Sequence, residues 1–171
     1  MNTTKTPSIR IINRGDCPKL TTRGQGTLSY EFGVKDDELF IRISANSQGG
    51  TFSFEWIQLQ TVEGLLENNN EKNFSAILFR KAFVSRSANN HGYLAAILKA
   101  VKVIDMSPHQ PAKLTFLSFD SIKDQLNHLK TEDLPDLVAA DLMKREAKKQ
   151  QRQTPVEPKK KGRPKKDVPP V

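Results

Sequence analysis

The chain has 171 residues, with 27 lysines and arginines against 19 aspartates and glutamates, and a hydrophobic content of 36%. This length suits one domain with an appendage, and the low hydrophobic content predicts that part of the chain is unfolded. Cys17 is the only cysteine, which excludes a disulfide framework and a cysteine-rich zinc site and fits a reducing cytoplasm. Apolar runs of signal-peptide or membrane-span length are absent, so we expect an unexported protein without a membrane partner.

The net charge of +8 lies entirely at the end of the chain. Residues 1–143 carry 16 bases and 16 acids, whereas residues 144–171 carry 11 bases and 3 acids. A neutral body with a basic terminal segment is the usual arrangement of a folded module with a polyanion-binding arm. We predict an α+β domain over residues 7–143, followed over 144–171 by a basic helical extension that continues into a disordered tail from residue 150.

Alternating apolar residues predict an antiparallel sheet in the first third of the chain. Three segments, 27–34, 39–45 and 51–56, show the period of two that is typical of strands, and turn-forming residues separate them. We interpret them as a three-stranded meander, with residues 8–13 as an additional edge strand. Basic residues near that strand, Arg10 and Arg14 among them, are expected to discourage edge-to-edge pairing. The predicted core face carries Tyr30, Phe32, Phe52, Phe54 and Trp56.

Helical spacing dominates the rest of the body. A short helix is predicted from Thr61 to Leu66, and residues 74–82 fit either a helix or a strand. A helix capped by Asn89 or Asn90 should extend to about Asp105. A strand at 114–116, a helix from Asp120 or Ser121, and a last helix opening at Asp133-Leu134-Pro135 complete the predicted order. The body is therefore a meander packed with C-terminal helices.

The tail contains Lys159-Lys160-Lys161-Gly162-Arg163-Pro164-Lys165-Lys166, which resembles an AT-hook. In that family the Gly-Arg-Pro core enters the minor groove of A·T-rich DNA, and basic residues on both sides meet the phosphates. The resemblance implies that Gly162, Arg163 and Pro164 form the core, with Lys160, Lys161, Lys165 and Lys166 as basic arms. Lys161 stands where the strong version has a second arginine, which implies weaker binding. The alternative is a plain basic tail that binds any polyanion.

A second basic cluster lies in the body. Between Glu71 and Asp105 the chain has six bases and no acid. Arg80, Lys81 and Arg86 are expected near the N-terminus of the helix that begins around residue 90, where N–H groups favour an anion. Asn90 and His91, with Ser87 and Asn89, are candidate hydrogen-bonding partners for a phosphate. The alternative is that these bases only cover the solvated face of two helices.

Other functional classes find less support in the residues. The three histidines lack metal-ligand spacing, and neither a Gly-rich phosphate loop nor a nucleophile elbow occurs, so no catalytic residue, metal or cofactor is predicted. Glu31, Glu55 and Asp120 are interpreted as carboxylates at the surface. A stacking platform for single strands would need exposed aromatic residues, for which only Phe40 is a candidate.

These observations favour a non-catalytic DNA-binding protein, architectural or regulatory, with a preference for A·T-rich duplex. The body's general pattern resembles accessory proteins of bacterial mobile elements, a resemblance that assigns no functional residue. We expect a cytoplasmic, nucleoid-associated protein. Two alternatives stay open: a protein-interaction module that its tail tethers to nucleic acid, and a domain that binds single-stranded nucleic acid.

Overall fold

The chain folds into two compact units, the first ending at Asp136 and the second beginning at Leu137. The structure, a computed structural model, describes residues 8–21 and 25–153. The division lies earlier than the boundary expected between residues 143 and 144. Helix α4 (Leu137–Gln153) accounts for the difference, because it continues without a break through that position.

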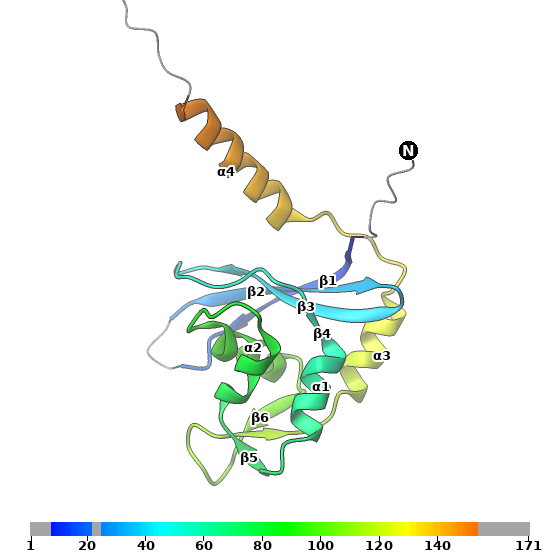
Figure 1. The fold of residues 1–171 in the computed structure, drawn as a ribbon. Helices are drawn as coiled ribbons and strands as arrows, with labels where there is room; N and C mark the ends of the chain where they lie inside the picture. Colours follow the sequence, from blue (N-terminus) through cyan, green and yellow to red (C-terminus); the bar gives the residue numbers. More distant parts are fainter. Residues whose placement is uncertain (1–7, 22–24, 154–171) are drawn as a thin grey trace, which may run out of the picture. The chain divides into compact units, whose positions relative to one another are not determined.

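The first unit is an α+β domain built on a four-stranded antiparallel sheet (Figure 1), which confirms the predicted fold class. The strands follow each other in the order β1 (Arg10–Pro18), β2 (Thr27–Lys35), β3 (Glu38–Asn46) and β4 (Ile57–Gln58). Asp36 and Asp37 connect β2 to β3 with φ of 50° and 66°. Two positive φ values in a two-residue hairpin match the right-handed twist of its strands, and aspartate tolerates this conformation.

The strand predicted for residues 51–56 is absent, and only β4 follows β3 in the sheet. The backbone of this segment bonds to side chains of residues 87–90 instead of to a neighbouring strand. The Ser53 N–H donates to Asn90 Oδ1 at 3.0 Å, and the Thr51 carbonyl accepts from both Ser87 and Asn89. The alternating pattern predicted that these backbone groups bond to a neighbouring strand. Their actual partners lie more than 30 residues away in sequence, so the local pattern does not reveal them.

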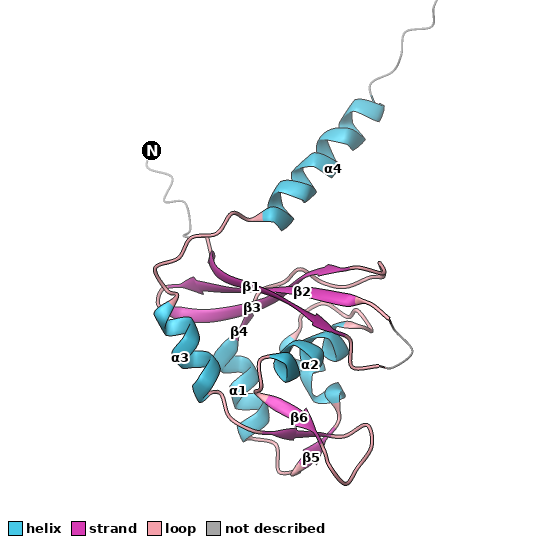
Figure 2. Cartoon of the chain, turned by 180° about the vertical axis from the view of Figure 1, so that it is seen from behind, coloured by secondary structure: helices cyan, strands magenta, loops and turns pink. Residues whose placement is uncertain are grey.

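Three helices lie against one face of the sheet, and a smaller sheet lies beyond them (Figures 1 and 2). The helices are α1 (Leu59–Glu67), α2 (Asn90–Ala100) and α3 (Asp120–His128). Leu28, Phe32 and Ile41 from the sheet share one buried core with Leu94 and Leu98 of α2. This burial of apolar area is the main source of stability for the unit.

Helix α2 ends before the predicted limit near Asp105. Lys102 takes a φ of 61°, and the N–H of Val103 donates to the Leu98 carbonyl at 2.9 Å. These two features close the helix with a Schellman-type turn, although the left-handed residue is usually glycine. The chain then enters a strand, β6 (Ile104–Met106), which sequence periodicity did not indicate.

The second, smaller sheet has the order β5 (Asn73–Phe74), β7 (Leu114–Phe116) and β6. The sequence of residues 74–82 fits either a helix or a strand, and the structure divides this stretch between a strand and a 3₁₀ helix. Phe74 ends β5, and the 3₁₀ helix η1 (Ala76–Ala82) follows, with Phe79 fully buried against Phe74. The exposed Arg80 and Lys81 thus follow directly after an apolar anchor.

The predicted aromatic core face is correct only in part. Phe32 is buried, and Tyr30 and Phe52 are half-buried against the core. Trp56 lies elsewhere, because its ring stacks on the Arg42 guanidinium at 4.4 Å and reaches Gly33. Both Arg42 and Gly33 belong to the strand positions that alternate with the core residues, so Trp56 covers the opposite face of the sheet.

Candidate nucleic-acid interface

The structure gathers four of the five predicted body residues around one hollow of about 470 Å³. Arg80 comes from the end of η1, Arg86 from the loop after it, and Asn90 and His91 from the first turn of α2. Five further residues complete the lining: Phe83, Val84, Ser85, Ser87 and Ala88. Lys81 is exposed next to Arg80 but does not line the hollow. No acidic side chain of residues 8–21 or 25–153 lines it.

His91 contributes a neutral ring to this hollow. Burial, followed by the positive charge of Arg80, holds the pKa of the His91 imidazole below its ordinary value of 6.5. Arg80 Nε donates to His91 Nδ1 at 3.5 Å, which requires that nitrogen to be unprotonated. His91 is therefore a ring and a hydrogen-bonding group at neutral pH, and the positive charge of the hollow comes from the arginines.

Asn90 has a structural position. Its side chain is only 1% exposed, its Oδ1 accepts from the Ser53 N–H, and its Nδ2 donates to Ser85 Oγ at 2.8 Å. Both halves of the amide are thus used inside the protein. Asn90 joins residues 51–55 to the loop that carries Arg86, so it shapes the hollow and leaves any phosphate contact to the arginines.

Glu55 binds the loop that forms one wall of the hollow. Its carboxylate accepts from the Val84 N–H at 2.7 Å, from the Ser85 N–H at 3.2 Å and from Ser53 Oγ at 2.8 Å. The expectation that Glu55 is merely a surface carboxylate is wrong. The loop N–H groups do favour an anion, and the protein itself supplies one. Sequence alternation gave no indication of this, because the donors lie about 30 residues further along the chain.

The Glu55 contacts predict an acid-sensitive contribution to stability. Burial raises the pKa of Glu55, but hydrogen bonds from Ser53, Val84 and Ser85 lower it by more in total, so the pKa lies below its ordinary value of 4.5. A carboxyl whose folded pKa is lowered stabilises the fold above its unfolded pKa and loses this effect as the pH falls through the folded pKa. Glu55→Gln should therefore cost about 1 kcal/mol at neutral pH and progressively less as the pH falls through the folded pKa.

Urea unfolding of the wild type and of Glu55→Gln at pH 7 and near pH 3 measures this difference. Glu67→Gln, at an exposed position on α1, is the matched control and should change little at either pH. An equal cost of Glu55→Gln at both pH values would show that the carboxylate charge does not hold the loop.

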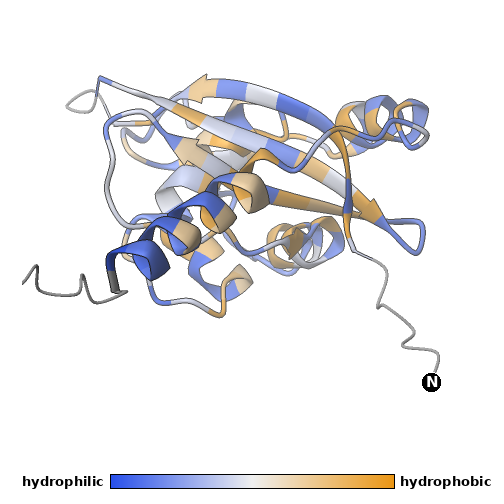
Figure 3. Cartoon of the chain, turned by 90° about the horizontal axis from the view of Figure 1, so that it is seen from above, coloured by the Kyte–Doolittle hydropathy of each residue, from blue (hydrophilic) through white to orange (hydrophobic). Residues whose placement is uncertain are grey.

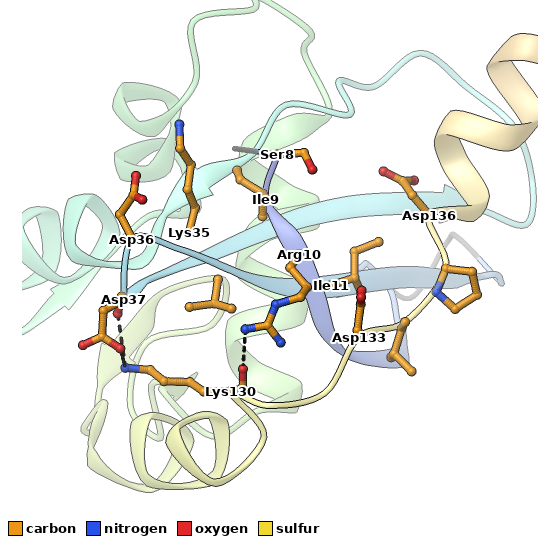
Figure 4. A pocket seen from close by; sticks show the side chains of 13 residues that line it. Ser8, Ile9, Arg10, Ile11, Lys35, Asp36, Asp37, Lys130, Asp133 and Asp136 are labelled. Carbon is orange, nitrogen blue, oxygen red and sulfur yellow. Dashed lines mark hydrogen bonds and ion pairs between the residues drawn. The ribbon is translucent and has the colours of Figure 1, made fainter. Parts of the chain in front are cut away.

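Two arginines of β1 hold the segment from Lys130 to Asp136, which we call the strap. The Arg10 guanidinium donates to the carbonyls of Lys130 and Glu132, and Arg14 donates to the Pro135 carbonyl. The Leu134 N–H donates to the Ile11 carbonyl at 2.8 Å, which adds one bridge to the edge of β1. Figure 4 shows this region, where a hollow of about 730 Å³ lies between the strap, the start of β1 and the β2–β3 turn.

The strap corrects two expectations. The helix predicted to open at Asp133 begins only at Leu137, because the preceding residues bond to the sheet. Arg10 and Arg14 form hydrogen bonds and an ion pair within the first unit. They protect the edge of β1 by holding the strap against it.

A buried ion network lies on the sheet face opposite the helices. Glu31 is 1% exposed and accepts from Arg14 Nε at 2.6 Å and from Arg42 Nε at 2.7 Å. Arg42, itself 5% exposed, also pairs with Asp136 of the strap at 2.6 Å. Glu31 was expected at the surface because it alternates with the apolar residues of β2. Trp56 and the strap bury that second face, which the sequence did not indicate.

Helix α4 forms the described part of the second unit and carries its bases on one side. Lys144, Arg145, Lys148, Lys149 and Arg152 recur at helical spacing. At 3.6 residues per turn they fall within an arc of about 140°. Arg145 pairs with Asp141 at 2.7 Å, and the hydrophilic colour dominates the C-terminal half of the helix in Figure 3. The predicted basic helical extension thus gathers its bases on one side of the helix.

The AT-hook-like residues lie outside the described residues. They are Lys160, Lys161, Gly162, Arg163, Pro164, Lys165 and Lys166.

Comparisons with known proteins give no indication of function, so the function is argued from the arrangement of the residues described above. No family model, curated protein or solved structure matches the chain. Over residues 8–21 and 25–153, no helix is both long and apolar enough to cross a membrane. In the same part of the chain, no group of three or more histidine, cysteine, aspartate or glutamate side chains is arranged to hold a metal ion.

Proposed function

We propose that this protein binds DNA without catalysing a reaction, and that the second unit supplies most of the affinity. The single observation that carries the proposal is the one-sided basic face of α4, which leads into the basic residues of the hook-like sequence. Lysine and arginine side chains that neutralise phosphates release condensed counterions, and this release drives DNA binding of little sequence dependence. Five bases on one side of a helix can follow a phosphate backbone or a groove.

The first unit adds a smaller basic surface. Its acids and bases largely balance, and several arginines are engaged within it. Arg80 and Arg86, however, both line a hollow that no carboxylate from the described part of the chain lines. A protein with these properties would act as an architectural or regulatory factor associated with the nucleoid in the cytoplasm, with the hook-like residues adding a preference for A·T-rich duplex.

The proposal is tested by titrating duplex DNA with the full chain and with a chain that ends at Gln153, at several salt concentrations. The deleted residues contain six bases. If most of them meet phosphates, the slope of log K against log salt should become shallower by about 0.9 for each phosphate that is no longer neutralised. Absence of DNA binding by the full chain at low salt would overturn the proposal and favour a protein-interaction module.

The same titration on A·T-rich and G·C-rich duplexes separates a groove contact from a plain polycation. Arg163→Ala should remove the preference for A·T-rich DNA, whereas its matched control Lys159→Ala should weaken binding to both duplexes equally. Equal behaviour of the two variants would contradict the hook assignment and leave the general DNA-binding proposal in place.

A further inference from the structure

The hollow of the first unit differs in composition from a flat phosphate-contacting surface. It combines two guanidinium groups, Arg80 and Arg86, with two rings, Phe83 and His91. Its volume of about 470 Å³ is within the range of small-ligand pockets. Flat phosphate contacts need cations alone, whereas rings beside cations suit a ligand that has both a charged group and an aromatic ring.

The concave shape of this hollow suits an unpaired nucleotide better than a continuous duplex. A base that is paired and stacked in a duplex cannot enter a pocket unless it leaves the stack, which costs its pairing and stacking free energy. A free nucleotide or the last nucleotide of a strand incurs little of this cost. A terminal phosphate also carries close to two negative charges at neutral pH, against one for a phosphate within the chain, and this matches two arginines.

The positions of the individual groups fit such a ligand. Arg86 is exposed and forms no ion pair with another described residue, so its guanidinium group is available. Glu55, the carboxylate bound to this loop, is engaged with the N–H groups of Val84 and Ser85. Val84, which is 95% exposed, adds an apolar side chain to the lining.

We propose that this hollow binds one nucleoside monophosphate unit, with Arg80 and Arg86 on the phosphate and Phe83 and His91 against the base. The unit is either a free nucleotide or the phosphorylated end of an unpaired strand. The strand form rests on the proposed function, since it deepens DNA binding into recognition of an end. The free-nucleotide form does not depend on the second unit or on the hook-like residues.

Calorimetric titration of the full chain with deoxyadenosine 5′-monophosphate, deoxyadenosine and inorganic phosphate tests the site. The monophosphate should bind about tenfold or more tightly than either fragment, because only it reaches both the arginines and the rings. Arg86→Gln should weaken monophosphate binding about tenfold. Lys81→Gln removes the same charge from a neighbouring exposed position that does not line the hollow, and it should leave binding unchanged.

Phe83→Leu separates the two halves of the site. It should lower the affinity for the monophosphate towards that for inorganic phosphate, with thermal unfolding recorded to show that the variant is folded. Oligonucleotides with and without a 5′-phosphate distinguish the source: a preference for the phosphorylated strand that Arg86→Gln removes supports end recognition, and its absence with monophosphate binding intact supports a free nucleotide. If no monophosphate binds while duplex DNA does, the inference is overturned and the proposed function stands.

Discussion

Replacing Glu31 with glutamine should lower the free energy of unfolding by about 3 to 5 kcal/mol. Glu31 is 1% exposed, and its two carboxylate oxygens accept from Arg14 and Arg42. The substitution preserves shape but removes the negative charge between two guanidinium groups, and one of these, Arg42, is also buried. A buried charge without its partner retains its desolvation cost but not the compensating attraction.

Urea unfolding measures this effect as a lower midpoint with an unchanged slope. Asp37→Asn is the matched control, because Asp37 pairs with Lys130 but its side chain is 88% exposed. An exposed pair of this kind contributes less than about 1 kcal/mol. Similar losses of stability for the two variants would show that the Glu31 network is no more important than a surface ion pair.

Neutralising the basic face of α4 should cause the largest loss of DNA affinity. The variant replaces Lys144, Arg145, Lys148, Lys149 and Arg152 with glutamine, which has a helix propensity close to that of lysine. If four of these bases meet phosphates, the salt slope falls by about 3.6, and the affinity near 0.1 M salt falls by roughly a thousandfold or more. Fluorescence anisotropy with a labelled duplex at several salt concentrations measures both quantities.

The control for this variant removes three positive charges from the first unit, by replacing Lys72, Lys81 and Lys102 together with glutamine. These three bases are exposed and do not line the hollow. The control should lower affinity only slightly, and circular dichroism should show the same helix content in both variants. A comparable reduction of affinity in the control would contradict a specific role of α4 and indicate general attraction by net charge.

The local sequence pattern is sufficient to predict a helix or strand whose hydrogen-bonding partners are close to it in sequence. The β2–β3 hairpin is predictable because its alternation and its Asp36-Asp37 turn are both local. Helix α3 is predictable from its apolar spacing for the same reason, although its N-cap is Phe119 and not Asp120 or Ser121. Residues 51–56 have an equally clear alternation and form no strand, because the competing partners Ser87, Asn89 and Asn90 are distant in sequence.

The candidate site shows the same limit. The acid-free stretch contains Arg80, Arg86 and His91, which the structure brings around one hollow. Composition cannot separate Lys81, which lies outside the lining, from Arg80 beside it. Nor can it show that Glu55 binds the loop, or that Arg10 and Arg14 are engaged with a strap more than 100 residues further along the chain. Long-range partners decide which charges remain available for a ligand.

The ion network also constrains how this sequence can change. Arg14, Glu31, Arg42 and Asp136 come from three strands and the strap, and each charge is matched by another member. Lysine is a poor replacement for Arg42, because Arg42 uses Nε and a terminal nitrogen on separate carboxylates while its plane stacks on Trp56. In a related or redesigned sequence these positions should therefore vary together, and an apolar replacement would have to substitute the whole set at once.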